Sequence, residues 1–171
     1  MFLDFLKKFL LKRKLKQALS FISDNFSLNK IKTVGLVIDE TYFSDKELLL
    51  QQLITEGIKK QDITLLLYHD KDKKRDTNFS SFSLKNVSWS GDVANQEIID
   101  FKANNFDLLI SYYDVEKVPL VLVTQRSKAL FKVGFSTIDK RINHFMIDTT
   151  AEQSTIFIQE LFKYLRILNK I

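Results

Sequence analysis

The sequence contains no cysteine, only one proline and only four glycines. The absence of cysteine excludes a disulfide scaffold, a thiolate metal site and a cysteine nucleophile. With so few glycines, the chain has neither a glycine-rich dinucleotide-binding turn nor a Walker-type phosphate loop. The segment at 39–45, which follows the first expected strand, has acids where a pyrophosphate would bind. We therefore expect no cofactor and no metal centre.

Long apolar runs are also absent. No window approaches about 18 consecutive apolar residues, so we expect no membrane-spanning helix. Acidic and basic residues interrupt the apolar start at Asp4, Lys7 and Lys8, and Lys12, Arg13 and Lys14 follow it. This order is the reverse of a secretory signal, in which basic residues precede an unbroken apolar stretch. The sequence predicts a soluble, cytoplasmic protein, with the periphery of a membrane or ribosome left open.

The positive charge of the chain is concentrated at its N-terminus. The net charge is +5, and residues 1–16 hold six of the 26 bases and one of the 21 acids. The remaining residues therefore hold 20 bases and 20 acids and are neutral as a body. Any non-specific attraction to nucleic acid or to an anionic surface belongs to this short segment.

Residues 2–22 are predicted to form a helix because they are rich in leucine, lysine and phenylalanine and lack glycine and proline. Two apolar stripes lie on nearly opposite sides of this helix, at about 100° per residue. The first stripe holds Phe2, Leu3, Phe5, Leu6, Phe9 and Leu10, and the second holds Leu11, Leu15, Ala18, Leu19 and Ile22. A straight helix cannot bury both stripes on one core. Either it breaks near Leu10, or its first half faces something other than its own domain.

The rest of the chain alternates between expected strands and helices. Apolar, β-branched runs predict strands at 31–38, 63–68, 106–112, 131–135 and 144–147, with an ambiguous segment at 79–89. Capping-box patterns at 44–47 and 150–153 predict two helix starts, Gly57 is expected to end the first of these helices, and further helices are expected at 94–104 and from Pro119 to Ala129. Residues 70–78 are predicted to form a charged loop.

This alternation predicts an α/β fold with three layers and a doubly wound, mostly parallel, Rossmann-like sheet, from which the N-terminal amphipathic helix protrudes. We divide the chain into the helix at 1–28 and a single domain at 29–171. The connection between the last two strands is too short for a helical crossover, which favours an antiparallel pair there.

In such a sheet, ligands bind outside the carboxyl ends of the strands. Asp39 and Asp114 follow two of these strands and could form an acid–base pair or hold a divalent cation, with His69 as a candidate base. The alternative, which we favour, is that the aspartates cap helices and that both histidines are structural or solvated. Other candidates at this edge are polar or aromatic: Glu40, Tyr42, Tyr112, Tyr113, Asp139 and Arg141.

The N-terminal helix carries the stronger functional prediction. Its apolar first half suits a membrane anchor, a partner's groove or self-association, and its basic second half suits phosphates of RNA or lipid headgroups. The predicted partner-binding residues are Phe2, Phe5, Leu6, Phe9, Lys12, Arg13, Lys14 and Lys16. The competing interpretation is a kinked helix packed wholly on its own domain, with solvated lysines.

Three segments resemble an uncharacterised family of small proteins from Bacteroidota: 32–43 (KTVGLVIDETYF), 106–117 (FDLLISYYDVEK) and 131–136 (FKVGFS). The resemblance covers essentially the whole chain and implies no activity. The stretch from Phe106 to Ser136 is also similar to the N-terminal half of heptosyltransferase-type glycosyltransferases. That similarity implies a shared fold without the nucleotide-sugar site, because the second domain of those enzymes has no room here.

The sequence thus predicts a non-catalytic binding or adaptor module whose basic helix docks on an RNA or ribosome, or on an anionic membrane surface. The alternative is a small enzyme that acts on a phosphorylated or sugar-like metabolite at the strand carboxyl ends. A third hypothesis is a homodimer formed through the N-terminal phenylalanines. Sequence-specific nucleic-acid recognition, including that of DNA, is not expected because the segment lacks an aromatic platform.

Overall fold

The computed structural model describes residues 2–20, 29–70, 79–93 and 95–171, and for Phe2 only the backbone. Its centre is a six-stranded sheet in the order β3-β2-β1-β4-β5-β6. All neighbouring strands pair in parallel. The strands are β1 (Val34–Asp39), β2 (Ile63–Tyr68), β3 (Ser80–Phe82), β4 (Leu108–Tyr112), β5 (Lys132–Phe135) and β6 (Phe145–Ile147).

The central strands form because their apolar runs can be buried on both faces. Every residue of β1 and of β4 is buried, as expected for parallel strands covered by helices on both sides. The two strands pair with Val34 opposite Leu108. On the other side of β1, Val34 lies opposite Ile63. The predicted α/β class and the predicted strand at 63–68 are confirmed.

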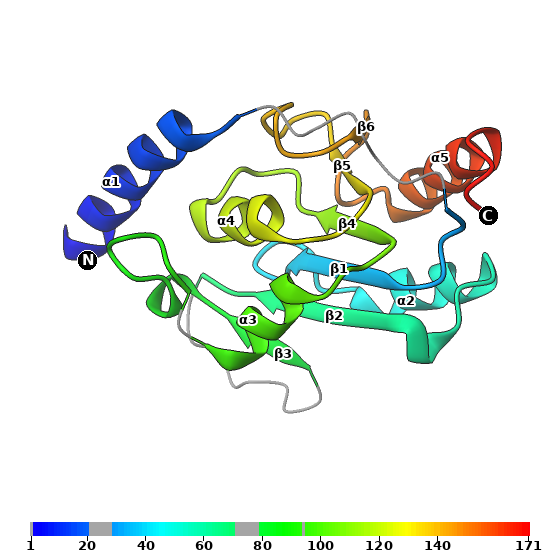
Figure 1. Cartoon of the computed structure of the whole chain (residues 1–171), viewed down its shortest axis with the longest axis horizontal. Coiled ribbons are helices and arrows are strands. Elements are labelled where there is room, and N and C mark those ends of the chain that lie inside the picture. The colour runs from blue at the N-terminus through cyan, green and yellow to red at the C-terminus, as the bar shows by residue number, and fades with distance from the viewer. Residues whose placement is uncertain (1, 21–28, 71–78, 94) are drawn as a thin grey trace.

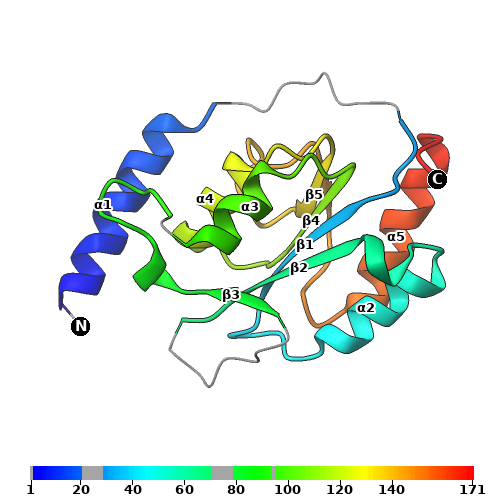
Figure 2. The same cartoon turned by 60° about the horizontal axis from the view of Figure 1, so that its bottom comes forward.

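Helices cover both faces of the sheet (Figures 1 and 2). One face carries α2 (Lys46–Thr55) and α5 (Ser154–Ile167), and the other carries α3 (Gln96–Ala103) and α4 (Val118–Arg126). Short 3₁₀ turns occupy Lys60–Asp62 and Leu84–Asn86. This arrangement confirms the three-layer, doubly wound prediction.

The expected antiparallel pair at the end of the sheet is wrong. β6 pairs parallel to β5, with Val133 opposite Phe145. Residues 136–144 return the chain through two turns, which are closed by hydrogen bonds from the Ile138 N–H to the Phe135 carbonyl and from the Ile142 N–H to the Asp139 carbonyl. A helix is not needed for this return because the strands are short, and a few extended residues span their length.

Both predicted capping boxes are misplaced. The N-cap of α2 is Asp45, whose carboxylate accepts the Leu48 N–H, and Gly57 follows the end of this helix with a φ of 101° as expected. At the other box, Thr150 and Gln153 close a turn, and α5 begins only after it. The side chain of Asp114 accepts the Ala151 N–H and fixes this turn ahead of the helix. A tertiary contact therefore competes with the local capping pattern.

Helix α1 (Phe2–Ala18) is continuous and lies outside the three layers, beside α4 (Figure 1). Leu11, Leu15 and Leu19 are buried, whereas Leu3 and Phe5 are exposed. Of the two alternatives for this helix, the break near Leu10 does not occur, and the first half faces away from the core. Ala18 is exposed, contrary to its predicted stripe. Ile22, residues 71–78 of the charged loop predicted at 70–78, and the Phe2 side chain are outside the described residues.

Within the described part of the chain, no helix is long and apolar enough to span a membrane.

Candidate functional site

The site lies where the strand order reverses, between β1 and β4. In the sheet, β2 and then β3 lie on one side of β1, and β4, β5 and β6 lie on the other side. Loops that leave adjacent strands toward opposite faces separate at this point and open a crevice, where ligands of open α/β sheets bind. The carboxyl ends of β1, β2 and β4 all contribute residues to the crevice.

Lys117 is the central charge of this edge. Its Nζ lies 2.6 Å from Asp39 Oδ2 and 3.0 Å from Asp70 Oδ2. Lys117 precedes α4, Asp39 ends β1 and Asp70 follows β2, so the ammonium connects the two sides of the switch point. Asp39 is 3% exposed, and its other oxygen accepts the Thr41 N–H at 3.0 Å. Lys117 Nζ also lies 4.4 Å from the centre of the Tyr42 ring, a cation–π distance.

The Lys117 ammonium keeps Asp70 ionised. Burial by itself would raise the pKa of Asp70, but hydrogen bonds from Lys117 and Tyr68 outweigh it, and the pKa of Asp70 is lowered. The Tyr68 hydroxyl donates to Asp70 Oδ1 at 2.9 Å. Burial, followed by the negative charge of Asp70, raises the pKa of Tyr68, so the phenol stays protonated. The cluster therefore offers a carboxylate acceptor beside a fixed hydroxyl donor.

Two of the predicted candidates, Glu40 and His69, meet next to this cluster. His69 Nε2 lies 3.2 Å from Glu40 Oε2, and Lys46 Nζ lies 2.5 Å from Glu40 Oε1. His69 Nδ1 is buried and has no hydrogen-bond partner among the described residues. The contact with Glu40 fixes the orientation of the imidazole. His69 therefore belongs to a chain of polar contacts that runs through Glu40 to Lys46.

Asp114, Tyr112 and Tyr113 hold the sheet to its helices and do not line the crevice. Asp114 Oδ2 accepts the Ala151 N–H at 2.8 Å, and the Tyr112 hydroxyl donates to the Ala151 carbonyl at 2.7 Å. The Tyr113 hydroxyl lies 2.8 Å from Thr124 Oγ1, and both tyrosines are at most 1% exposed. Burial raises the pKa of both phenols. In the described part of the chain, no ion pair or shared partner joins Asp39 to Asp114.

Asp139 and Arg141 lie in the loop between β5 and β6 and pair with each other. Arg141 Nε lies 2.9 Å from Asp139 Oδ1, and the fork is completed at Oδ2. Hydrogen bonds from Arg141 lower the pKa of Asp139 to about 2. Arg141 also donates to the Leu19 carbonyl at 3.2 Å, just beyond the end of α1. Arg141 therefore holds the end of the N-terminal helix in place, and its charge is already neutralised by Asp139, which does not favour an anion site.

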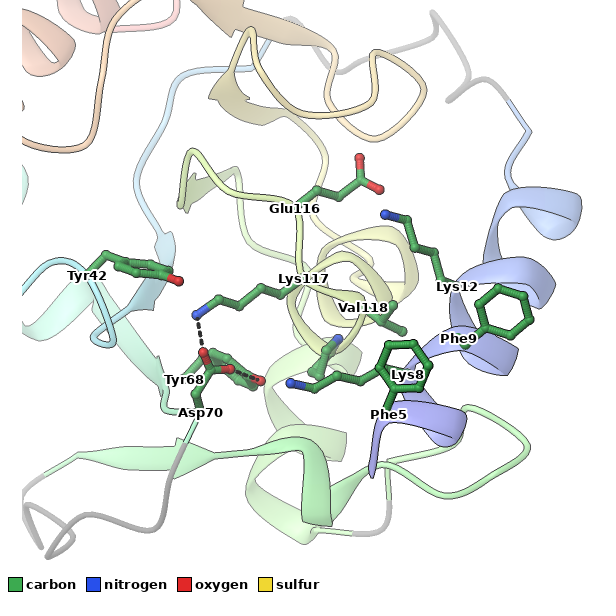
Figure 3. Close-up of a pocket in the computed structure, with 11 residues that line it drawn as sticks. Phe5, Lys8, Phe9, Lys12, Tyr42, Tyr68, Asp70, Glu116, Lys117 and Val118 are labelled. Atoms are coloured by element: carbon green, nitrogen blue, oxygen red, sulfur yellow. Dashed lines mark hydrogen bonds and ion pairs between the residues drawn. The ribbon is translucent and has the colours of Figure 1, made fainter. Parts of the chain in front are cut away.

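A cleft of about 420 Å³ lies at this edge, between α1 and the strand ends (Figure 3). It is lined by Phe5, Lys8, Phe9, Lys12, Tyr42, Tyr68, Asp70, Glu116, Lys117, Val118 and Pro119. Lys8 points from α1 toward Tyr68 and Asp70 in Figure 3. Phe5 and Phe9 are largely exposed and border its mouth.

Sequence reasoning missed Lys8, Tyr68, Glu116 and Lys117 as site residues. Asp114 is a sequence candidate because ligands bind outside the carboxyl ends of strands. Glu116 and Lys117 meet the same criterion, because all three residues lie between β4 and α4. Lys8 could not be placed from sequence, because its position in the cleft depends on how α1 packs against α4. Among the described residues, no three histidine or carboxylate side chains gather as metal ligands.

Comparison with known proteins adds a family but no activity. Residues 5–168 match the model of a family of unknown function (DUF6913). Neither the curated proteins nor the solved structures contain a match.

Proposed function

We propose that this chain, which belongs to the family of unknown function DUF6913, is a non-catalytic adaptor that docks on an anionic membrane surface through helix α1. The observation that carries the proposal is an apolar surface on a well-formed helix. Leu3 is 66% exposed, Phe5 69% and Phe9 58%. Leu6 and Leu10 are also exposed on this half of the helix.

The exposed apolar side chains are close neighbours in the first turns of α1. Contiguous apolar patches of this kind mark membrane or protein contacts, whereas scattered ones need no explanation. Full burial of one leucine or phenylalanine contributes about 1.5–3 kcal/mol. Several such side chains in one contact would hold the chain on an apolar phase.

Charge favours an anionic membrane over the other partners. Lys12, Arg13, Lys14 and Lys16 are exposed in the second half of α1, and each base near an anionic bilayer contributes about 1 kcal/mol. Apolar and basic residues together are typical of helices that lie in the membrane interface. A homodimer through the same surface would bring two segments of equal positive charge together. RNA offers phosphates but no partner for the leucines.

Vesicle pelleting tests the proposal. The full chain should pellet with vesicles of phosphatidylglycerol and phosphatidylcholine, and much less with phosphatidylcholine alone. The variant L3S/L6S should bind the anionic vesicles at least about tenfold more weakly. The matched control is L48S/I167S, which removes two exposed apolar side chains from α2 and α5 (43% and 64% exposed) and should bind like the parent.

Three results would overturn the proposal. The two double variants could lose binding equally, which would indicate a general effect of apolar surface. The chain could pellet with ribosomes and not with vesicles, which would assign the helix to RNA. It could also form a dimer in light scattering that L3S/L6S dissociates, which would assign the apolar face to self-association.

The alternative function is a small enzyme that acts on a phosphorylated or sugar-like metabolite. The cleft at the strand ends is the observation that favours it. Its candidate groups would be Asp39, which pairs with Lys117, and His69, which contacts Glu40. The similarity of Phe106 to Ser136 to heptosyltransferase-type glycosyltransferases and the resemblance to Bacteroidota proteins stay predictions.

A further inference from the structure

We propose that the cleft between α1 and the strand ends binds a sugar phosphate, with Lys8 and Lys12 holding the phosphate and the acids opposite them holding the hydroxyls. The proposal does not rest on membrane docking, whose test changes Leu3 and Leu6 outside the cleft lining, although Phe5, Phe9 and Lys12 belong to both surfaces. It assigns a ligand to the cavity at the point where the sheet order reverses.

The cavity has the size and construction of a small-molecule site. Its volume of about 420 Å³ lies within the range of roughly 300–1,000 Å³ that is usual for ligand pockets. Four separate segments build it: α1, the loop after β1 that holds Tyr42, the residues at the end of β2, and the residues at the start of α4. Apolar walls with a few convergent polar groups are typical of such sites.

The two lysines from α1 are one helical turn apart. Residues at i and i+4 are neighbours on the helix surface, and like charges there repel each other. Neither Lys8 nor Lys12 has a carboxylate within 4.0 Å among the residues that the structure describes. A phosphate between them would remove the repulsion. Lys117, in contrast, is already neutralised by two aspartates.

The opposite side of the cleft is built for hydroxyl groups. Asp70 is held ionised by Lys117 and Tyr68, and a carboxylate can accept more hydrogen bonds than these two donors supply. The Glu116 carboxylate also lines the cleft and makes no ion pair within the described residues (Figure 3). A bare phosphate would be repelled by both acids. A ligand that adds hydroxyls to its phosphate satisfies both sets of groups.

The Tyr42 ring supplies an apolar surface for the sugar itself. It is 65% exposed and lines the same cavity. The Lys117 ammonium lies over the ring and holds it at the cleft wall. The C–H face of a sugar packs on such a ring, so all three parts of a sugar phosphate have a matching surface.

Titration with ribose 5-phosphate, followed by the backbone amide signals of the full chain, tests the assignment. We expect saturable shifts at Asp70 and Lys117. Ribose alone and inorganic phosphate alone should each bind at least about tenfold more weakly. The variant K8Q/K12Q should weaken ribose 5-phosphate binding by about tenfold or more. The matched control R13Q/K14Q removes the same charge from exposed positions of α1 outside the cleft and should stay within about twofold.

The proposal is overturned if ribose 5-phosphate does not saturate up to about 10 mM, or if both double variants weaken binding equally. It is also overturned if inorganic phosphate binds as tightly, which would indicate an adventitious ion only. The variant L3S/L6S should bind ribose 5-phosphate like the parent even where it no longer binds vesicles, so the two proposals can fail separately.

One further arm identifies the source of the sugar phosphate. Vesicles that contain phosphatidylinositol 4-phosphate present a phosphorylated polyol at the membrane. If ribose 5-phosphate displaces the chain from these vesicles but not from phosphatidylglycerol vesicles, the natural ligand is a lipid headgroup. If it displaces the chain from neither, the cleft binds a soluble ligand. Either result agrees with the proposed chemistry.

Discussion

Lys117 shows how one side chain can organise an edge of a sheet. Its side chain is 12% exposed and that of Asp39 is 4% exposed, so the pair is largely desolvated. Removing one member of a buried ion pair leaves an uncompensated charge, whereas removing both does not. The stability of this edge therefore depends on the pair as a unit.

Lys117→Met should lower the free energy of unfolding by about 3 kcal/mol, because Asp39 would keep its buried charge without a cation. The double variant D39N/K117M should recover part of this loss. Urea denaturation at pH 7 measures both. A loss below about 0.5 kcal/mol in the single variant, which is typical of a solvated pair, would contradict the desolvated interpretation.

Lys132 is a second buried cation, and its partners are carbonyls. Its Nζ donates to the Thr124 carbonyl at 2.8 Å and to the Gln125 carbonyl at 3.2 Å, in the last turn of α4. A cation there interacts favourably with the helix dipole. Burial nevertheless lowers the pKa of Lys132 from 10.5 to about 8. The buried ammonium therefore lowers the stability of the folded state at neutral pH, since the unfolded chain binds this proton more tightly.

The stability of the chain should depend on pH through Lys132. Between pH 8 and pH 10.5 the unfolded state holds the Lys132 proton and the folded state releases it. The contribution of Lys132 to the free energy of unfolding therefore increases as the pH rises. We expect the stability of the parent relative to Lys132→Met to increase by about 2–3 kcal/mol across this window. Urea denaturation at pH 8 and pH 10 measures the difference. A constant difference would show that the lysine keeps its ordinary pKa.

Helix α1 is attached to the body by one side only. Leu11 and Leu15 are buried at 2% and 5% exposure. The Leu11 side chain lies near Gly91, which has a φ of 92° that favours glycine. Arg141 holds the carbonyl of Leu19. The first half of the helix adds a wall to the cleft but buries little of its own apolar surface.

The variant L11A/L15A should detach α1 while leaving the sheet folded. Each leucine truncation removes about 2–5 kcal/mol of packing, which is large for a helix held by one face. Hydrogen exchange should become fast across 2–18 and stay slow in β1 and β4. The control Leu3→Ala, at an exposed position, should change neither. Loss of protection throughout the chain would contradict the division at residue 28.

The strands show which elements can be predicted from local sequence. The runs that became β1, β2 and β4 are apolar and β-branched, and their burial on both faces follows from composition. Segment 79–89 was ambiguous because β3 has three residues and pairs only with β2. The direction of β6 depends on its pairing with β5, and no local pattern encodes that pairing.

At the scale of the whole molecule, charge and topology converge on one side. The strand order places the ends of β1 and β4 at the switch point, and α1 lies across that side with the excess positive charge of the chain (Figure 2). Because the charged helix lies next to the cleft at the strand ends, one side of the molecule could both dock on a membrane and bind a ligand. The same helix contributes to both proposed sites, and Phe5, Phe9 and Lys12 belong to both.

The composition and periodicity of the sequence determined the α/β class, the parallel core strands, the charge of the N-terminus and the two-sided character of α1. These are local properties, because burial pattern and charge are carried by neighbouring residues. Only the tertiary structure decided that Lys117 joins Asp39 and Asp70, that Asp114 and Tyr112 hold the turn at Ala151, and that α1 closes a cleft with Lys8 and Lys12. Each of these depends on residues far apart in the chain, whose separation is set by packing.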